Sequence, residues 1–221
     1  PWSYIKFPFL KTPGWKGFVD GADSGLYRVA PLARLNVADG MATPLAQAHY
    51  EEFFTVLGGK PVHSTLATHW ARLIEALQAT EVIQALANDP EILSPVVRRL
   101  PEAPPTEGIG IVEAPRGTLI HHYATDPNGI LTMVNLIVAT VHTSAPIQMS
   151  IDRAAKGVIH GGKVDDGLLN MVEMAFRAYD PCFGCATHSL PGEMPLKATI
   201  RNARGEAVEV VERHKGLGAR G

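Results

Sequence analysis

The sequence has few cysteines, little net charge and no long apolar run, which argues against several large classes of protein. It contains two cysteines, Cys182 and Cys185, too few for a disulfide-stabilised scaffold. Its formal net charge of −2 gives no sign of an electrostatic nucleic-acid binder. The longest apolar run, residues 129–141, is interrupted by polar residues and is shorter than the roughly 18 residues that cross a membrane. No secretory signal is recognised either, so we expect a cytoplasmic protein, where a close cysteine pair more often serves metal or redox chemistry.

The residues that are present suffice for a sizeable core, because 46% of the 221 are hydrophobic. The first forty are rich in aromatic residues, glycine and proline, which predicts irregular chain with short strands. Thr43 and Pro44 predict the start of a helix that ends at Gly58. A longer helix is expected next, capped by Ser64. Its apolar face comprises Leu66, Trp70, Leu73, Ile74 and Leu77.

The second half of the chain alternates between strand-like and helix-like segments. Residues 88–108 hold five prolines and predict a linker. Runs rich in strand-forming residues follow at 108–115, 117–125 and 130–141. Two helices are expected at 144–160 and 165–179, and the tail predicts two strands joined as a hairpin. The expected fold is therefore α+β: a mostly helical body with a small β-sheet and a C-terminal β-hairpin extension.

Both cysteines lie in Asp-Pro-Cys-Phe-Gly-Cys-Ala-Thr-His, residues 180–188, with His188 three positions after the second. Zinc needs four ligands and this motif supplies three, so the fourth would come from elsewhere. A c-type haem needs the histidine directly after the second cysteine. A thioredoxin-like redox pair starts a helix, whereas this pair is expected to follow one. The spacing alone leaves a transition-metal site, a redox pair and two buried thiols open.

Three segments together resemble the large subunits of nickel–iron hydrogenases. Residues 180–188 are similar to the family's C-terminal metal-binding signature, Asp-Pro-Cys-x-x-Cys-x-x-His. Residues 27–37 resemble its Arg-Val-Gly-Pro-Leu-Ala-Arg segment, with Ala30 where a glycine is usual, and residues 113–123 resemble its Glu-Ala-Pro-Arg-Gly segment. The segments follow the family's order and span essentially the whole chain. The similarity is greatest to the branch that reduces methyl viologen, a deazaflavin cofactor or NAD.

The resemblance implies a Ni-Fe centre bound by the cysteine motif. Cys182 would be a terminal nickel ligand, and Cys185 would bridge nickel and iron, which suits soft thiolates. In this family the iron also carries carbon monoxide and cyanide ligands. His188 would bind a separate divalent ion, usually magnesium.

The resemblance also implies roles for three residues around that centre. Arg116 would place its guanidinium over the open edge of the two metals, where its fork of donors can hydrogen-bond a cyanide and orient a proton acceptor. Asp180 is its natural partner, and Thr143 is a further candidate donor to the other cyanide. Without the resemblance, Arg116 would be interpreted as part of an ordinary salt bridge and Asp180 as a turn residue. His121 and His122 face opposite sides of a strand, so they cannot share one ion.

The resemblance breaks at two places. The family's N-terminal signature, Arg-x-Cys-Gly-x-Cys-x-x-x-His, supplies two further cysteine ligands that this sequence lacks. We therefore expect residues 1–188 to be the C-terminal portion of a large subunit, inactive alone. Its partners would be the N-terminal half and an iron–sulfur small subunit. Residues 189–221 resemble the extension that a maturation endopeptidase removes after nickel-insertion proteins have acted, so this chain as isolated is expected to carry no metal. The alternative is that this tail is a permanent β-hairpin that is not removed.

Two interpretations from other classes stay open at this stage. One is a non-catalytic assembly module that holds zinc or nickel with Cys182, Cys185 and His188. The other is a degenerate paralogue with a structural role in an electron-transfer complex.

Overall fold

The computed structural model describes residues 6–187 and 196–213 and confirms the α+β class. The helices in chain order are η1 (Ala22–Ser24), α1 (Pro31–Val37), α2 (Pro44–Val56), α3 (Ala67–Ala87), η2 (Pro90–Leu93), α4 (Ala139–His142), α5 (Ser144–Val158), α6 (Asp166–Arg177) and α7 (Phe183–Thr187). The strands are β1 (Glu107–Ala114), β2 (Gly117–Thr125), β3 (Leu131–Ile137), β4 (Leu196–Arg201) and β5 (Ala207–Arg213).

Helix α2 begins as predicted, with Thr43 as its N-cap and Pro44 as its first residue. The cap is completed from another helix, because Thr43 donates its hydroxyl to Glu81 of α3 at 2.6 Å. The Glu81 carboxylate also accepts the amides of Leu45 and Ala46, at 3.2 and 3.1 Å. The hydrogen bond from Thr43, followed by those from the amides, lowers the pKa of Glu81 despite some desolvation. A side chain of α3 thus fixes where α2 starts.

Helices α1 and α2 both pack against α3, and their buried side chains form one core. The predicted apolar face of α3 is only partly correct. Ile74 is buried, and Trp70 and Leu77 pack on the core, but Leu66 and Leu73 are exposed. The core instead takes Ala67 and Ala71, whose small side chains let the neighbouring helices approach closely. The helix also starts at Ala67 rather than at a Ser64 cap.

The prediction of short strands in the first forty residues is wrong for the part that is described, residues 6–40. This segment contains η1 and the seven-residue α1, which Pro31 begins. The buried face of helix α1 consists of Pro31, Leu32 and Leu35. Three positions in seven residues are too few to show a helical period in the sequence. The strand expected at 130–141 likewise ends at Ile137, and its remainder forms α4.

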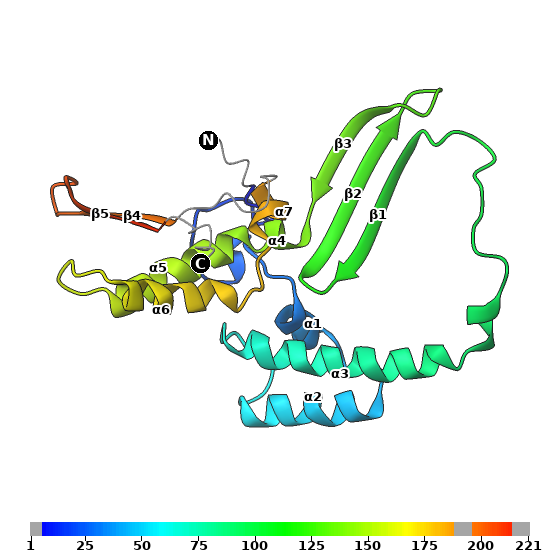
Figure 1. The fold of residues 1–221 in the computed structure, drawn as a ribbon, viewed down its shortest axis with the longest axis horizontal. Coiled ribbons are helices and arrows are strands. Elements are labelled where there is room, and N and C mark those ends of the chain that lie inside the picture. Colours follow the sequence, from blue (N-terminus) through cyan, green and yellow to red (C-terminus); the bar gives the residue numbers. More distant parts are fainter. Residues whose placement is uncertain (1–5, 188–195, 214–221) are drawn as a thin grey trace, which may run out of the picture.

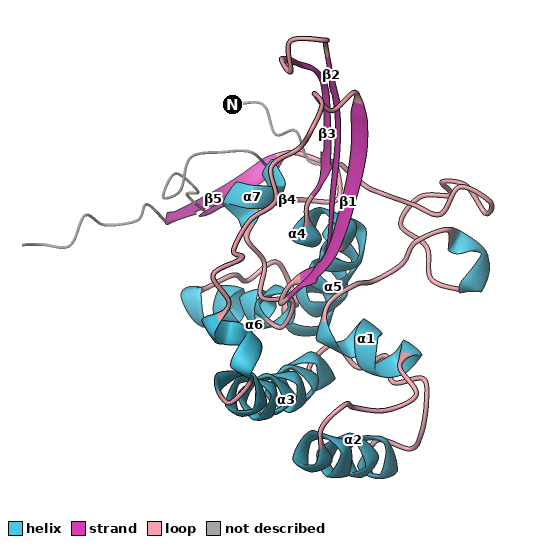
Figure 2. Cartoon of the chain, turned by 90° about the vertical axis from the view of Figure 1, so that its right-hand side faces the viewer, coloured by secondary structure: helices cyan, strands magenta, loops and turns pink. Residues whose placement is uncertain are grey.

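Strands β1, β2 and β3 form an antiparallel sheet with β2 in the centre. The β1–β2 turn lies at the base of the sheet, next to the helices, and the opposite end projects away from them (Figure 1). That far end carries the predicted Asp-Pro-Asn-Gly turn, in which Gly129 donates its amide to the carbonyl of Asp126 at 2.9 Å. Figure 2 shows the sheet rising from the helical part. The carbonyl of Pro115 in the β1–β2 turn accepts hydrogen bonds from Arg34 of α1 and Arg72 of α3, so the turn lies beside these two helices.

Helix α6 is capped as expected, because the Asp165 side chain accepts the amide of Leu168 at 2.9 Å. It packs against α5 with Leu169 and Val172 buried. The predicted C-terminal hairpin is present as β4 and β5 and extends away from the body in Figure 1. Within the described ranges, 6–187 and 196–213, no helix combines the length and apolar character needed to cross a membrane.

Ala30, the residue that departs from the family's glycine, occupies a backbone conformation that suits glycine. Its φ is 83° and its ψ is −179°, and it is 2% exposed. This region is essentially restricted to glycine and costs a residue with a Cβ about 1–3 kcal/mol. Pro31 immediately after it starts α1, so the entry angle of that helix depends on this conformation.

We predict that Ala30→Gly raises the free energy of unfolding by about 1 kcal/mol, because relief of backbone strain exceeds the entropy cost of glycine. Chemical denaturation monitored by circular dichroism measures the change. The matched control is Ala71→Gly, a buried alanine within α3, which should lower stability by about 1 kcal/mol. Equal losses in the two variants would contradict the strain at Ala30.

Candidate functional site

Arg34 of α1 holds the β1–β2 turn against the helices. Its Nε and Nη2 donate to the two carboxylate oxygens of Glu75 on α3, at 2.7 and 2.6 Å. Its Nη1 donates to Glu113 and to the carbonyl of Ala114, both at 2.9 Å, and its Nη2 also reaches the carbonyl of Pro115 at 3.2 Å. The arginine of one family-like segment therefore orients the turn of another.

Gly117 lets the same turn approach the chain ahead of α1. Its φ is 131°, and a Cβ on it would lie 2.2 Å from Cγ2 of Val29 and 3.1 Å from the backbone nitrogen of Ala30. Any side chain larger than hydrogen would collide there. The glycine of Glu-Ala-Pro-Arg-Gly is thus required by close contact with the Val-Ala-Pro residues.

Arg116 directly precedes Gly117 in the β1–β2 turn. The predicted contact between Arg116 and Asp180 is confirmed. Nε of Arg116 donates to the backbone carbonyl of Asp180 at 2.9 Å and lies 3.2 Å from its Oδ2 atom. Asp180 has a φ of 51°, a left-handed conformation that aspartate tolerates. The Nη groups of Arg116 have no hydrogen-bond partner among the described residues. They remain able to bind a further acceptor.

Arg72 of α3 joins this pair and was not identified from the sequence. Its Nη1 donates to the carbonyl of Pro115 at 3.1 Å and lies 3.5 Å from Oδ2 of Asp180. Nothing in the pattern of α3 distinguishes this arginine from a solvated one. Its role emerges only where α3 passes both the β1–β2 turn and the residues ahead of the cysteines.

Cys182 and Cys185 are adjacent in space, with Cα atoms 5.3 Å apart, and the structure joins them by a disulfide. Cys182 directly precedes α7, and its carbonyl accepts the amide of Ala186 at 3.0 Å. The expectation that the pair merely follows a helix is therefore incomplete, because a second, five-residue helix begins between the cysteines. To bind a metal the pair has to be reduced to thiolates.

Two buried threonines lie beside the cysteine motif. Thr140, which sequence reasoning missed, accepts the amide of Cys182 on its hydroxyl oxygen at 3.1 Å. Thr143, the candidate from the sequence, donates its hydroxyl to the carbonyl of Thr140 at 3.1 Å. The threonine that contacts the motif is therefore Thr140, and the cyanide-donor role of Thr143 stays a prediction.

His188 lies outside the described residues. Within residues 6–187 and 196–213, no group of three or more histidine, cysteine, aspartate or glutamate side chains is arranged to hold a metal. What this part of the chain offers a soft metal is the cysteine pair. Its two sulfurs, one helical turn apart, suit a shared metal, while a four-thiolate centre needs two further cysteines from outside these 221 residues.

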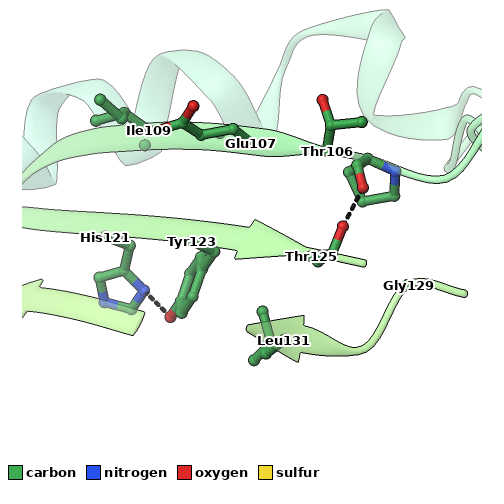
Figure 3. Close-up of a pocket in the computed structure, with 11 residues that line it drawn as sticks. Thr106, Glu107, Ile109, His121, Tyr123, Thr125, Gly129 and Leu131 are labelled. Atoms are coloured by element: carbon green, nitrogen blue, oxygen red, sulfur yellow. Dashed lines mark hydrogen bonds between the residues drawn. The ribbon is translucent and has the colours of Figure 1, made fainter. Parts of the chain in front are cut away.

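His121 and His122 serve the sheet rather than the cysteine motif. Nε2 of His122 lies 2.7 Å from Oε1 of Glu107, and Nδ1 of His121 lies 2.7 Å from the hydroxyl oxygen of Tyr123. The two histidines point to opposite faces of the sheet, as the alternation of side chains along a strand predicts. Figure 3 shows His121 and Tyr123 beside a hollow of about 590 Å³ at the far end of the sheet. Gly129 and Leu131 also line it, and Arg116 does not.

His142 ends α4 and is buried next to the site. Its Nδ1 lies 2.6 Å from the hydroxyl of Tyr27, and its Nε2 is buried without a hydrogen-bond partner among the described residues. Burial lowers the pKa of His142 and raises that of Tyr27, because it disfavours both charged forms. Burial between the chain ahead of α1 and α4 therefore disfavours the protonated imidazole.

Comparisons with known proteins show which proteins the chain resembles. The sequence model of the family described as "Nickel-dependent hydrogenase" matches residues 3–188. An F420-non-reducing hydrogenase iron-sulfur subunit of Archaeoglobus profundus is 52% identical over 96% of this chain and 43% of its own length. The NAD-reducing hydrogenase HoxS subunit beta of Cupriavidus necator is 42% identical over 94% of this chain and 42% of its own length.

A solved structure is also similar. A crystal structure of an NAD+-reducing [NiFe]-hydrogenase in the H2-reduced state matches with a TM-score of 0.76 and 44% identity, over 85% of this chain and 40% of that one. The chain thus spans less than half the length of the relatives that it matches.

We predict that Arg34→Met lowers the free energy of unfolding by about 2 kcal/mol, because it leaves the Glu75 carboxylate unpaired although that side chain is only 22% exposed. Urea denaturation measures the loss. The double variant Arg34→Met with Glu75→Leu should recover part of it, since no unpaired carboxylate remains. A double variant less stable than Arg34→Met alone would contradict this account.

We predict that His142 makes stability fall as the pH drops below about 6.5, the pKa of histidine in an unfolded chain. Because the folded pKa lies lower, the unfolded state binds the proton first, and its population rises with acidity. Denaturation midpoints between pH 5 and 8 give the slope, which His142→Phe should flatten.

Proposed function

The chain belongs to the nickel-dependent hydrogenase family, and we propose that it forms the C-terminal portion of a nickel–iron hydrogenase catalytic subunit. The reaction is the reversible oxidation of H2 to protons and electrons. One observation carries the proposal: Arg116 pairs with Asp180 directly ahead of Cys182 and Cys185, and Arg34 binds the turn that carries Arg116, so that three separate family-like segments meet at one place.

The cysteine pair is proposed to bind a Ni-Fe centre whose iron carries carbon monoxide and cyanide. Cys182 would be the terminal nickel ligand and Cys185 the bridging thiolate, and His188 would bind magnesium. The donor chemistry fits, because reduced thiolates are soft ligands and a sulfur can contact two metals. When bound, this centre supplies the chemistry that splits dihydrogen heterolytically.

The protein's own residues would orient the groups around that centre. Asp180 holds Nε of Arg116 through both its carbonyl and its carboxylate, which leaves the Nη edge for another acceptor. A guanidinium stays protonated, so this edge can donate to an anionic metal ligand or keep a proton acceptor in place without losing its own proton. Thr140 fixes the amide of Cys182, and Thr143 supports Thr140.

The centre requires partners. Because the sequence has two cysteines, the other two ligands would come from an N-terminal portion of the subunit. An iron–sulfur small subunit would carry the electrons to a diffusible acceptor. In support, relatives in this family are named as hydrogenase subunits and match over less than half their length. The 221 residues alone would be inactive, and the need for reduced thiols favours the cytoplasm.

Residues 189–221 are proposed to be an extension that a maturation endopeptidase removes after nickel-insertion proteins have loaded the site. In support, the family match ends at residue 188. The hairpin of β4 and β5 beyond it projects from the body and exposes Val208 and Val210 (Figure 1).

We predict that the assembled protein, with its N-terminal portion and iron–sulfur partner, reduces a dye with H2 and contains nickel. Arg116→Lys should lower this rate by about 100-fold or more at unchanged nickel content, because an ammonium has all its donors on one atom and cannot contact Asp180 while presenting donors where the Nη atoms of Arg116 lie. Hydrogen-dependent dye reduction and elemental analysis are the two measurements.

The matched control is Arg177→Lys at the end of α6, which contacts Asn170 and should keep the full rate. Stoichiometric zinc without any H2-dependent activity in the assembled protein would contradict the proposal. That result would instead favour a non-catalytic module that holds zinc or nickel with Cys182, Cys185 and His188.

A further inference from the structure

We propose that Arg72 of α3 is a positioning residue for Arg116 and acts through the carboxylate of Asp180; this inference rests on the proposed function. Nη1 of Arg72 lies 3.5 Å from Oδ2 of Asp180 and donates to the carbonyl of Pro115 at 3.1 Å. One guanidinium therefore contacts both segments of the proposed site: the turn that carries Arg116 and the residues directly ahead of the cysteines.

The carboxylate of Asp180 is shared between two arginines. Its Oδ2 atom lies 3.2 Å from Nε of Arg116 and 3.5 Å from Nη1 of Arg72. The Asp180 side chain is 43% exposed, and an ion pair at such a place contributes little by itself. The second guanidinium comes from a helix whose neighbouring residues, Ala71 and Ile74, are buried in the core. Arg72 thus restrains the carboxylate, and the carboxylate in turn restrains Nε of Arg116.

The turn itself does not depend on Arg72. The carbonyl of Pro115 also accepts a hydrogen bond from Nη2 of Arg34, and Nη1 of Arg34 donates to the carbonyl of Ala114. Removal of Arg72 should therefore leave the turn in place and release mainly the Asp180 carboxylate. Because Arg72 and Arg34 can be replaced independently, an effect of Arg72 on Asp180 can be distinguished from an effect on the turn.

The buried Nη2 atom of Arg72 also argues against a purely structural role. Its Nη2 atom is buried and has no hydrogen-bond partner among the described residues. A buried donor without a partner lowers stability, and an apolar side chain of similar length would avoid this loss. A guanidinium at this place is explained better by the two contacts that Nη1 makes.

The test uses the assembled hydrogenase with Arg72→Met, which keeps an apolar stem and removes every donor. We expect kcat for H2-dependent dye reduction to fall about 10- to 100-fold, the effect of a small misplacement of a reacting group. The KM for H2 and the nickel content should stay unchanged, because H2 is uncharged and gains nothing from the arginine. Arg72→Lys, which keeps the charge on a shorter stem, should give an intermediate kcat.

Hydrogen exchange measured by mass spectrometry supplies a readout that does not depend on activity. In Arg72→Met, amides in residues 178–182 should exchange faster, while those in residues 114–118 should exchange as in the wild type, because Arg34 still binds the carbonyls of Ala114 and Pro115. The control is Arg153→Met, which removes an exposed arginine that pairs with Asp20. This variant should match the wild type in kcat and in exchange.

The proposal is overturned if Arg72→Met keeps kcat within twofold of wild type and unchanged exchange at 178–182 while Arg116→Lys is impaired; the proposed function then stands. If the metal-loaded assembled wild type shows no H2 activity, the proposed function fails. The exchange comparison then decides alone whether Arg72 holds Asp180. If Arg72→Met does not assemble, Arg72→Gln replaces it and is judged by the same two results.

Discussion

The pairing of Arg34 with Glu75 is the interaction on which the rest of the site depends. Glu75 takes two donors of the guanidinium, at 2.7 and 2.6 Å, and so fixes the plane of the group. Donors on the remaining edges then reach Glu113, Ala114 and Pro115 of the β1–β2 turn. Arg34 and Glu75 come from helices α1 and α3, which pack in one core, so the turn that Arg34 binds is held rigidly against that core.

Unusual backbone conformations concentrate where the family-like segments touch. Ala30 and Asp180 are the non-glycine residues with positive φ in the described part of the chain, at 83° and 51°. Gly117, at 131°, lies against Val29 with no room for a Cβ. One of the three is in each segment. Of the three, only Ala30 is strained, because aspartate tolerates the left-handed region and glycine adopts positive φ freely. Such strain persists only where surrounding contacts fix the conformation, and it is common at functional sites.

The site combines a group of charged side chains, Arg72, Arg116 and Asp180, with the cysteine pair, whose sulfurs are soft metal ligands. Two arginines share the carboxylate of Asp180, and the Nη atoms of Arg116 have no hydrogen-bond partner among the described residues. The cysteine pair follows directly and is fixed at the amide of Cys182 by buried Thr140. A metal with anionic ligands bound at the cysteines would thus lie near donors that are already oriented, which reduces the reorganisation needed during reaction.

Local signals in the sequence determined the elements whose cause is local. Pro44 started α2, Asp165 capped α6, and alternating strand-forming residues with an Asp-Pro-Asn-Gly turn defined the sheet. The partnership of Arg116 with Asp180 followed from the family resemblance, whereas the spacing of the two cysteines left a metal site, a redox pair and two buried thiols open.

Tertiary structure alone decided the parts whose cause lies far away in the chain. The seven-residue α1 has too few apolar positions to show a period, and the core face of α3 shifted to Ala67 and Ala71 because neighbouring helices pack there. Thr140 and Arg72 became recognisable only through contacts with Cys182 and Asp180, made by segments distant in sequence. A residue type and its spacing state which chemistry is available, whereas the packing of separate segments decides which side chains meet.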